Sequence, residues 1–332
     1  MRETIYLTKE ADQVRTLYET IRQGPRLIQG YGQHVRYLGI GEHLSVYNAT
    51  PPLWLKVGGK VCRVSVGRVE HPADCAHSRI MFFENWTATE YHLIDGAPVF
   101  YGEDPAVTTI GDEIVLTSVH VAAVRKDGHL LETEIRRADD VMQLWECRQR
   151  IPGKDNRFTP LDHGSRIGVM TRPQNKITDR GKMAYVELDN VDDVCEDSLR
   201  TARIIEFPMA DNTWVGGNEL HNLEKKGQIG ILAHGAFFED GYAPHGAKTY
   251  FIFFVWVDRK TLQVVDLEPL AFREDFPSSS SKTAALCNVA FGTGLVIPTG
   301  LARECPELYA GIGDLTQAFV PIKNPKIVGL YD

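Results

Sequence analysis

A short motif recurs five times along the chain and limits the folds that the chain can adopt. Each copy combines an Asn or Asp, a strand of alternating apolar residues, a turn that contains Gly, and a second apolar strand. The copies carry, in order, Asn48, Asp104, Asp155, Asn218 and Asn288, and the last copy is the weakest. They recur at intervals of roughly 50 to 70 residues, so each interval can hold a four-stranded sheet with its loops.

Five four-stranded sheets in one chain predict an all-β fold, a five-bladed β-propeller whose sheets surround a central channel. We expect a single domain over residues 1–332, with blade cores near 48–85, 99–136, 155–190, 214–258 and 286–322. A short N-terminal helix is predicted over residues 9–22, where Val14, Leu17 and Ile21 have helical spacing, and a second short one over 192–202. A β-sandwich or two separate all-β domains are the alternatives.

Composition excludes several classes of function. The 332 residues are 43% hydrophobic and 24% charged, and the net charge of −8 argues against a nucleic-acid-binding surface. No apolar run approaches the ~18 residues of a membrane span, and the N-terminus lacks the apolar core of a signal peptide. The six cysteines form no C-x-x-C pair, which favours buried, reduced thiols in a cytoplasmic protein without a metal site.

The familiar catalytic and nucleotide-binding motifs are absent from the sequence. There is no P-loop, no G-x-G-x-x-G at a helix start, no G-x-S-x-G and no H-E-x-x-H. Nucleotide binding by those routes, serine hydrolysis and zinc proteolysis are therefore disfavoured.

Polar residues at the starts of the inner strands would meet at the axis of a propeller. Paired acids and amides suit sugar hydroxyls, and a basic set beside them suits phosphate. The candidates for sugar binding are Asn48, Arg68, Glu70, Asn218, Glu219 and Asp314, and those for phosphate are Arg172, Arg180, Lys182 and His234. Sugar, phosphate and one carboxylic acid together indicate phosphorolysis. Each residue also has an ordinary interpretation: a turn cap for Asp104, a surface ion pair for Arg68 and Glu70, and a structural role for His234.

An ordered series of motifs resembles a known family over about residues 44 to 325. The motifs are "YNATPP", "GRVE", "EDPAVT", "KDNRF", "RIGVMTRPQ", "RGKMAYVEL", "WVGGNELH", "IGILAHG" and "ELYAGIGD". They resemble domain of unknown function 1861, associated with the mannogen-type β-1,2-mannosyltransferases and phosphorylases of glycosyltransferase family 108. That family is similar to the β-mannoside phosphorylases of glycoside hydrolase family 130, and the resemblance also implies a five-bladed propeller.

The resemblance implies roles for individual residues. Asp104 matches the general acid of the E-D-P segment, and Glu103 beside it would orient Asp104 or raise its pKa. Further matches are Arg68 and Glu70 in R-V-E, Lys154 and Asp155 in K-D, Arg172 and His234 for phosphate, and Asp314 in G-x-x-D. Two positions depart from the related phosphorylases. Ala106 stands where they have Arg, and "GGNELH" replaces their phosphate-binding Lys, for which Lys182 or Arg180 could substitute.

These matches predict an inverting β-1,2-mannoside phosphorylase or mannosyltransferase. It would form or use α-mannose 1-phosphate, with inorganic phosphate as co-substrate and GDP-mannose as a further candidate donor, and with no metal or other cofactor. Its expected partners are mannose-containing oligosaccharides, not nucleic acid or membrane, and the sequence leaves its oligomeric state open. The alternatives are an inverting hydrolase of the same fold, with Glu70, Glu219 or Asp155 as base, and a non-catalytic sugar-binding propeller.

Overall fold

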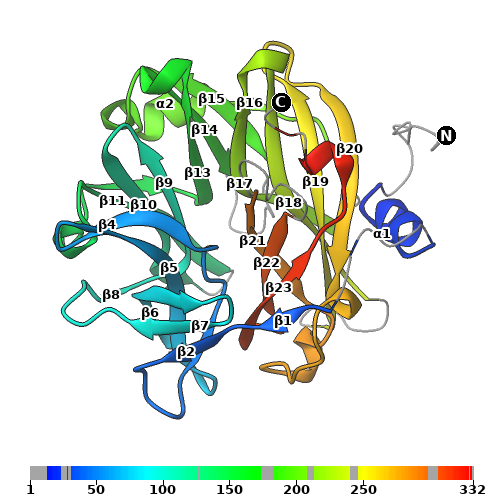
Figure 1. Ribbon diagram of the computed structural model, residues 1–332. Helices are drawn as coiled ribbons and strands as arrows, with labels where there is room; N and C mark the ends of the chain where they lie inside the picture. The colour runs from blue at the N-terminus through cyan, green and yellow to red at the C-terminus, as the bar shows by residue number, and fades with distance from the viewer. Residues whose placement is uncertain are drawn as a thin grey trace.

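The computed structural model describes residues 13–23, 28, 31–125, 128–172, 182–207, 213–239, 246–297, 306–328 and 330. Within these residues the strands form five sheets, four of four strands and one of seven (Figure 1). We number the sheets 1 to 5 in chain order. The predicted all-β class is therefore confirmed.

The sheets have the following strands. Sheet 1 contains β2 (Arg36–Leu38), β3 (Ser45–Tyr47), β4 (Leu53–Val57), β5 (Lys60–His71), β6 (Asp74–Thr87), β7 (Glu90–Leu93) and β8 (Phe100–Tyr101). Sheet 2 contains β9 (Glu103–Ile110), β10 (Glu113–Arg125), β11 (Gly128–Ala138) and β12 (Gln149–Pro152). Sheet 3 contains β13 (Lys154–Leu161), β14 (Arg166–Arg172), β15 (Ala184–Leu188) and β16 (Arg203–Ile204). Sheet 4 contains β17 (Thr213–Leu223), β18 (Gln228–Phe238), β19 (Lys248–Asp258) and β20 (Val264–Phe272). Sheet 5 contains β21 (Ala290–Val296), β22 (Glu307–Ile312), β23 (Thr316–Pro321) and β1 (Gln33–His34).

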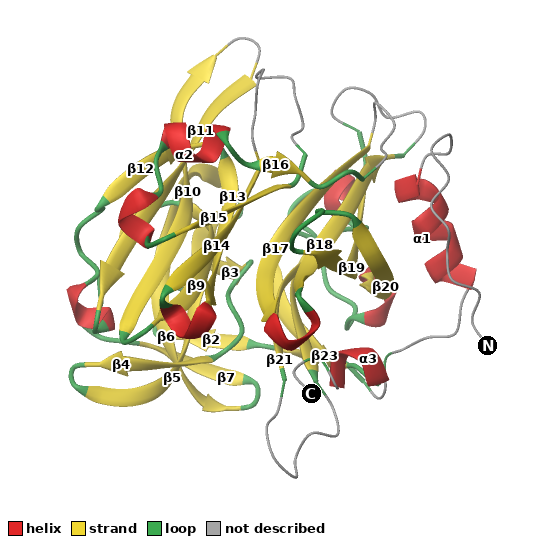
Figure 2. Ribbon diagram, turned by 90° about the horizontal axis from the view of Figure 1, so that it is seen from above, coloured by secondary structure: helices red, strands yellow, loops and turns green. Residues whose placement is uncertain are grey.

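The sheets follow one another around a ring. β5 contacts β9, β9 contacts β13, β13 contacts β17, and β17 contacts β21. Sheet 5 then contacts sheet 1 through β23 and β3. Because β1, from the start of the chain, is the outer strand of sheet 5, the two ends of the sequence close the ring together (Figure 1). Figure 2 shows α1 (Gln13–Gln23) beside sheet 4. The fold is therefore propeller-like rather than a sandwich of two sheets.

Each sheet is buried on both faces by its neighbours. The sequence of β19, "KTYFIFFVWVD", is an almost unbroken apolar run, as expected of a strand that is covered on both sides. Buried side chains form a hydrophobic cluster between each pair of adjacent sheets, including the pair formed by sheets 5 and 1. Packing between sheets therefore holds the ring together, and the polar residues of the inner strands remain for the axis.

Sheet 1 differs from the predicted four-stranded pattern because it has seven strands. β5 and β6, of 12 and 14 residues, are long enough to pair with several short strands each. β3 and β4 both pair with β5, while β7 and β8 both pair with β6. The additional strands are short pieces from residues 36–57 and 100–101, a region where the repeat predicted fewer strands.

Helices are short and lie outside the ring. α1 (Gln13–Gln23) is the predicted N-terminal helix, and it packs Val14 and Tyr18 against sheet 4. Residues 9–12 of the prediction lie outside the described part of the chain. α2 (Glu196–Arg200) falls within the second predicted helix, and α3 (Pro325–Val328) is a single turn. None of the helices in the described residues has the length and apolar content that a membrane crossing requires.

Four of the six cysteines have described side chains, and these four are less buried than the sequence predicts. Cys62 and Cys147 are half-buried free thiols, whereas Cys195 and Cys287 are exposed. Cys195 stands at the N-terminus of α2, where its Sγ accepts the backbone N–H of Ser198 at 3.5 Å. The exposure of Cys195 follows from this position, because the first backbone N–H groups of a helix need acceptors from residues at the helix start.

Gln317 on β23 forms hydrogen bonds where the ring closes, and its substitution tests how much they stabilise the fold. Its buried amide donates to the Ala49 carbonyl at 3.0 Å and accepts the Ala49 N–H at 3.1 Å, which joins sheet 5 to sheet 1. Gln317→Ala would leave both backbone groups of Ala49 buried without partners, so we expect the free energy of unfolding to fall by about 2–4 kcal/mol. Chemical denaturation measures this loss. The exposed Lys323→Ala should change stability by less than about 0.5 kcal/mol, and equal stabilities of the two variants would refute the closure role of Gln317.

Candidate active site

The inner strands of sheets 2 to 5 share a β-bulge. β9, β13, β17 and β21 each carry one more residue than the partner strand across the irregularity. The bulges lie at Asp104 and Pro105, at Asp155 and Asn156, at Asn218, and at Thr293. A bulge bends its strand and redirects a side chain, and bulges are common beside active sites. The motif predicted from the sequence is thus a bulged inner strand.

The backbone gives a first reason for the residue types in the motif. Asn48, Asp104 and Asp155 have positive φ angles of 47°, 45° and 58°. Asn and Asp tolerate the left-handed region better than other residues that bear a side chain. Asp314, in the turn between β22 and β23, has a φ of 51°. Backbone geometry and chemistry therefore favour the same residues at these positions.

Asp104 is held by residues of sheet 1. Asn48 Nδ2 donates to Asp104 Oδ1 at 2.8 Å, and Arg68 Nη1 lies 3.6 Å from the same oxygen. The side chain of Asp104 is 16% exposed, so its carboxylate is not fully buried. A Cβ at Gly311 would overlap Asn48 Oδ1, and this glycine therefore leaves the space that Asn48 needs. The predicted grouping of Asn48, Arg68 and Asp104 is found in the structure.

Arg68 also joins two further acids. Its Nη2 lies 3.0 Å from Glu103 Oε1 and 3.0 Å from Glu70 Oε2. Burial raises the pKa of Glu103, although the charge of Arg68 opposes that rise and the charge of Asp104 adds to it. Glu103 thus contacts the same arginine that contacts Asp104.

Glu70 is enclosed by donors. Arg68 and Ser78 donate to Oε2, while Tyr47 at 2.8 Å and Lys282 donate to Oε1. Burial alone would raise the pKa of Glu70, but Arg68, Lys282, Ser78 and Tyr47 lower it below its usual value. Because both oxygens are occupied, Glu70 serves here as the anchor of Arg68, and not as a free ligand for sugar hydroxyls.

A second cluster surrounds Asp155. Arg172 Nη1 lies 2.9 Å from Asp155 Oδ2, Lys154 Nζ 3.8 Å from the same oxygen, and Arg157 Nη2 3.7 Å from Oδ1. Burial alone would raise the pKa of Asp155, but Lys154, Arg172 and Arg157 hold it well below its usual value. Three cations thus surround one carboxylate, which leaves the cluster with an excess of positive charge and suits it to an anion.

His234 borders this basic cluster in a neutral form. Asn218 Nδ2 donates to the Gly292 carbonyl, so Asn218 Oδ1 faces His234 and accepts a hydrogen bond from its Nδ1–H at 2.9 Å. Burial lowers the pKa of His234 well below its usual value of about 6.5, and the charge of Arg172 lowers it further. The ring stacks on Tyr250 at 5.4 Å. In neutral His234 the proton therefore lies on Nδ1 and the lone pair on Nε2.

The two clusters lie at the same end of the ring, because the adjacent strands β9 and β13 carry Asp104 and Asp155 at comparable positions near their starts. Burial raises the pKa of Tyr250, and the charges of Asp314 and Asp104 raise it further while Arg172 opposes them. Burial likewise raises the pKa of Asp314, together with the charge of Asp104. Asp104 of sheet 2, Arg172 of sheet 3 and Asp314 of sheet 5 are thus close enough to interact.

Two of the predicted site residues, Glu219 and Lys182, have no contact with either cluster among the described interactions, and a third is not described. Glu219 accepts the Leu295 N–H at 2.9 Å and contacts His221 Nε2 at 3.0 Å, and it faces the opposite end of the channel. Lys182 is exposed, and Arg180 lies outside the described residues. The cations that adjoin Asp155 are instead Lys154 and Arg157, from the "KDNRF" motif itself.

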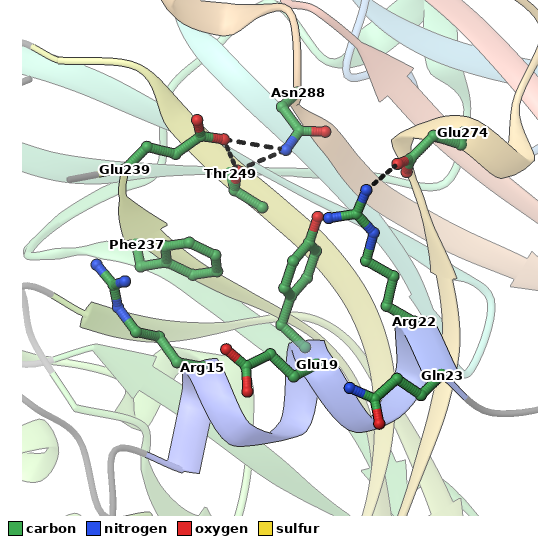
Figure 3. A pocket seen from close by; sticks show the side chains of 10 residues that line it. Arg15, Glu19, Arg22, Gln23, Phe237, Glu239, Thr249, Glu274 and Asn288 are labelled. Carbon is green, nitrogen blue, oxygen red and sulfur yellow. Dashed lines mark hydrogen bonds and ion pairs between the residues drawn. The ribbon is translucent and has the colours of Figure 1, made fainter. Parts of the chain in front are cut away.

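Sequence reasoning missed Lys282 and misplaced Asn288. Lys282 belongs to "FPSSSSKT", which has the composition of a plain loop, so its contact with Glu70 had no local signal. The bulge of β21 contains Thr293 and not Asn288. Asn288 Nδ2 donates to Thr249 at 2.6 Å and to Glu239 at 3.2 Å, at the edge of a pocket under α1 (Figure 3).

The buried, neutral His234 predicts a pH dependence of stability. Between the usual His pKa of about 6.5 and the lower pKa of folded His234, the unfolded chain binds one proton more than the native protein. Stability should therefore be lost as the pH falls from 6.5, by up to about 1.4 kcal/mol per pH unit from this group. In denaturation from pH 7 to 5, His234→Gln and His234→Asn should both show a shallower slope. Slopes equal to that of the unsubstituted protein would contradict the prediction.

Comparison with solved structures supports the propeller-like fold. MPT-1, a GDP-Man-dependent mannosyltransferase from Leishmania mexicana, superposes with a TM-score of 0.78 at 23% identity over 94% of each chain. MPT-4, a mannose phosphorylase from Leishmania mexicana solved with a phosphate ion, gives 0.79 at 22% identity, over 95% of this chain and 93% of that one. A β-1,2-mannobiose phosphorylase from Listeria innocua gives 0.55 at 15% identity, over 88% and 94%.

Comparison of the sequence with family models confirms the resemblance seen in the motifs. The model of a protein family of unknown function, DUF1861, matches residues 26–327. No match to a curated protein was found. The matched range contains all five sheets, and with them both clusters of the candidate site. This chain therefore belongs to the DUF1861 family.

Proposed function

We propose that this protein is an inverting β-1,2-mannoside phosphorylase or mannosyltransferase, and that its five sheets are the blades of one propeller domain. The observation that carries the proposal is the pairing of an accessible Asp104 with a basic cluster around Asp155 at one end of the ring. A general acid beside an anion site is what phosphorolysis of a glycoside requires. The solved mannosyltransferase and phosphorylases with similar folds support the choice of mannosides.

In this proposal Asp104 is the general acid. It gives its proton to the glycosidic oxygen, directly or through a neighbouring sugar hydroxyl, as the bond from the anomeric carbon to that oxygen breaks. Asn48 and Arg68 fix the carboxyl group, and Glu70 in turn fixes Arg68. Asp314 lies near Asp104 and serves as a partner for sugar hydroxyls.

Phosphate is the nucleophile, and its binding site is formed by Arg172, Lys154 and Arg157, with His234 at the border. A phosphate oxygen attacks the anomeric carbon from the face opposite the leaving oxygen, which inverts the configuration and gives α-mannose 1-phosphate. In reverse, Asp104 accepts the proton of the acceptor hydroxyl. GDP-mannose is also an α-mannosyl phosphate and could donate by the same route.

A hydrolase of the same fold would need a second carboxylate to activate water. Glu70 is enclosed by four donors, Glu219 lies toward the other mouth, and Asp155 is surrounded by three cations. These positions favour phosphate over water as the nucleophile, and we therefore rank the hydrolase second. A non-catalytic sugar-binding propeller is the third candidate.

Asp104→Asn tests the general acid. Because Asn also tolerates a positive φ, the variant should keep the fold and the hydrogen bond from Asn48. We expect the release of α-mannose 1-phosphate from β-1,2-mannooligosaccharides, with phosphate present, to fall about 10²- to 10⁴-fold. If the unsubstituted protein releases free mannose in the absence of phosphate, the hydrolase is favoured. Turnover that is unchanged in the variant would refute the assignment of Asp104, and no turnover in any condition, GDP-mannose included, would leave the binding propeller.

Lys154→Met and Lys182→Met form a matched pair that locates the phosphate. Lys154 adjoins Asp155 with a side chain 28% exposed, whereas Lys182 is exposed. Loss of one charge-assisted contact corresponds to roughly 10- to 100-fold in affinity. We expect Lys154→Met to raise the KM for phosphate by about that factor and to change the KM for mannoside little, and Lys182→Met to change neither. The opposite pattern would place the phosphate near Lys182, as the sequence first suggested.

A further inference from the structure

The channel has a second mouth, opposite the end that holds Asp104. A pocket of about 750 Å³ lies there, lined by the later residues of β9, β13, β17 and β21 and by the start of β4. Its volume falls within the range of small-molecule binding sites. None of the roles proposed for Asp104, Arg172 or His234 involves this pocket, which we call the far pocket.

An exposed tryptophan lies on the rim of the far pocket. Trp54 on β4 is 68% exposed, although burial of an indole ring is strongly favourable. Arg63, its partner on β5, lies over the ring with its Cζ 5.9 Å from the centroid. An indole ring on a rim offers a flat apolar surface, against which the C–H face of a pyranose ring can pack.

The polar groups of the far pocket suit a neutral ligand. Thr108, Thr109 and Thr159 supply hydroxyl groups, and Glu219 and His221 form a hydrogen-bonded pair. Among the described residues that line the pocket are two glutamates but no lysine or arginine, and Arg63 lies over the Trp54 ring on the rim. Inside the pocket an anion such as phosphate would therefore meet two carboxylates, whereas sugar hydroxyls would find both donors and acceptors.

The far pocket is closed off from the Asp104 end of the channel. Between them lies a cavity of about 20 Å³, bordered by Thr50, Ala106, Arg157, Asn218 and Thr293. A cavity of this size has room for about one water molecule. Arg157 closes it firmly, because its Nε donates to the Asn218 carbonyl at 2.9 Å. A sugar chain cannot pass through the ring, so a ligand in the far pocket would be bound independently.

We propose that the far pocket is a second carbohydrate-binding site, which binds neutral sugar units of an oligosaccharide between Trp54 and the Glu219–His221 pair. The identity of the sugar as a β-1,2-linked mannoside rests on the proposed function, but the existence of the site does not. The site also gives Glu219 a role in sugar binding away from the reaction centre.

Calorimetric titration with β-1,2-mannotetraose, without phosphate, tests the far pocket. Asp104→Asn serves as the background because it does not consume the ligand. In this background we expect each chain to bind two molecules of the tetrasaccharide, that is, two binding equivalents. When Trp54→Ala is added, we expect each chain to bind one. Trp86→Ala is the matched control, because Trp86 is 64% exposed and does not line the far pocket. Trp54→Phe should retain part of the affinity, since it keeps an aromatic ring.

The proposal is overturned if Trp54→Ala removes no binding equivalent, or if Trp86→Ala removes the same one. Phosphorolysis of β-1,2-mannobiose separates this result from the proposed function. Trp54→Ala alone should leave that activity unchanged within about twofold, because its reaction centre is intact. Phosphorolysis without a Trp54-dependent equivalent would reject the far site only. A Trp54-dependent equivalent without phosphorolysis would reject the proposed function only.

Discussion

One extra residue in the inner strand of each of sheets 2 to 5 determines where the polar side chains of the inner strands can point. The bulges of β9, β13, β17 and β21 interrupt the pairing at comparable positions. An inner strand without the bulge would alternate its side chains between the two faces that pack on neighbouring sheets. The bulge instead redirects Asp104 and Asp155 toward the axis, at the cost of a positive φ. Asn and Asp satisfy both the backbone and the chemistry, and few other residues would.

The redirected acids are stable in a buried position only because cations accompany them. Arg68 neutralises charge from Glu70, Glu103 and Asp104 across sheets 1 and 2. Arg172, Arg157 and Lys154 do the same for Asp155. An unpaired buried charge would be strongly destabilising, whereas paired charges fix each other's geometry. The same pairs that permit burial therefore also pre-organise the acid and the anion site before any ligand binds.

The sequence predicted the parts of this arrangement that depend on local chain geometry. The motif with Asn48, Asp104, Asp155 and Asn218 was visible because local geometry restricts most of these positions to a few residue types. Asn48, Asp104 and Asp155 have a positive φ, and Asp104, Asp155 and Asn218 lie at bulges. The fifth copy was misaligned, because Thr293 occupies its bulge and no Asn or Asp is required there. Contacts between distant segments could not be predicted. Lys282 reaches Glu70 over 212 positions of sequence, and nothing in a serine-rich loop indicates that partner.

Register across the bulge also explains why neighbours in sequence lie at different mouths of the channel. Asn218 contacts His234 beside the basic cluster, whereas the next residue, Glu219, faces the far pocket. The inner strands begin at the Asp104 end, and their later residues, such as Thr108 and Thr159, line the other. Arg and Lys accompany the acids near the strand starts, and uncharged hydroxyl groups lie farther along. One ring of strands thus separates the cations that accompany Asp104 and Asp155 at one mouth from a second mouth whose described lining residues include no lysine or arginine, and the two proposed sites differ accordingly in the charge of the ligand that they fit.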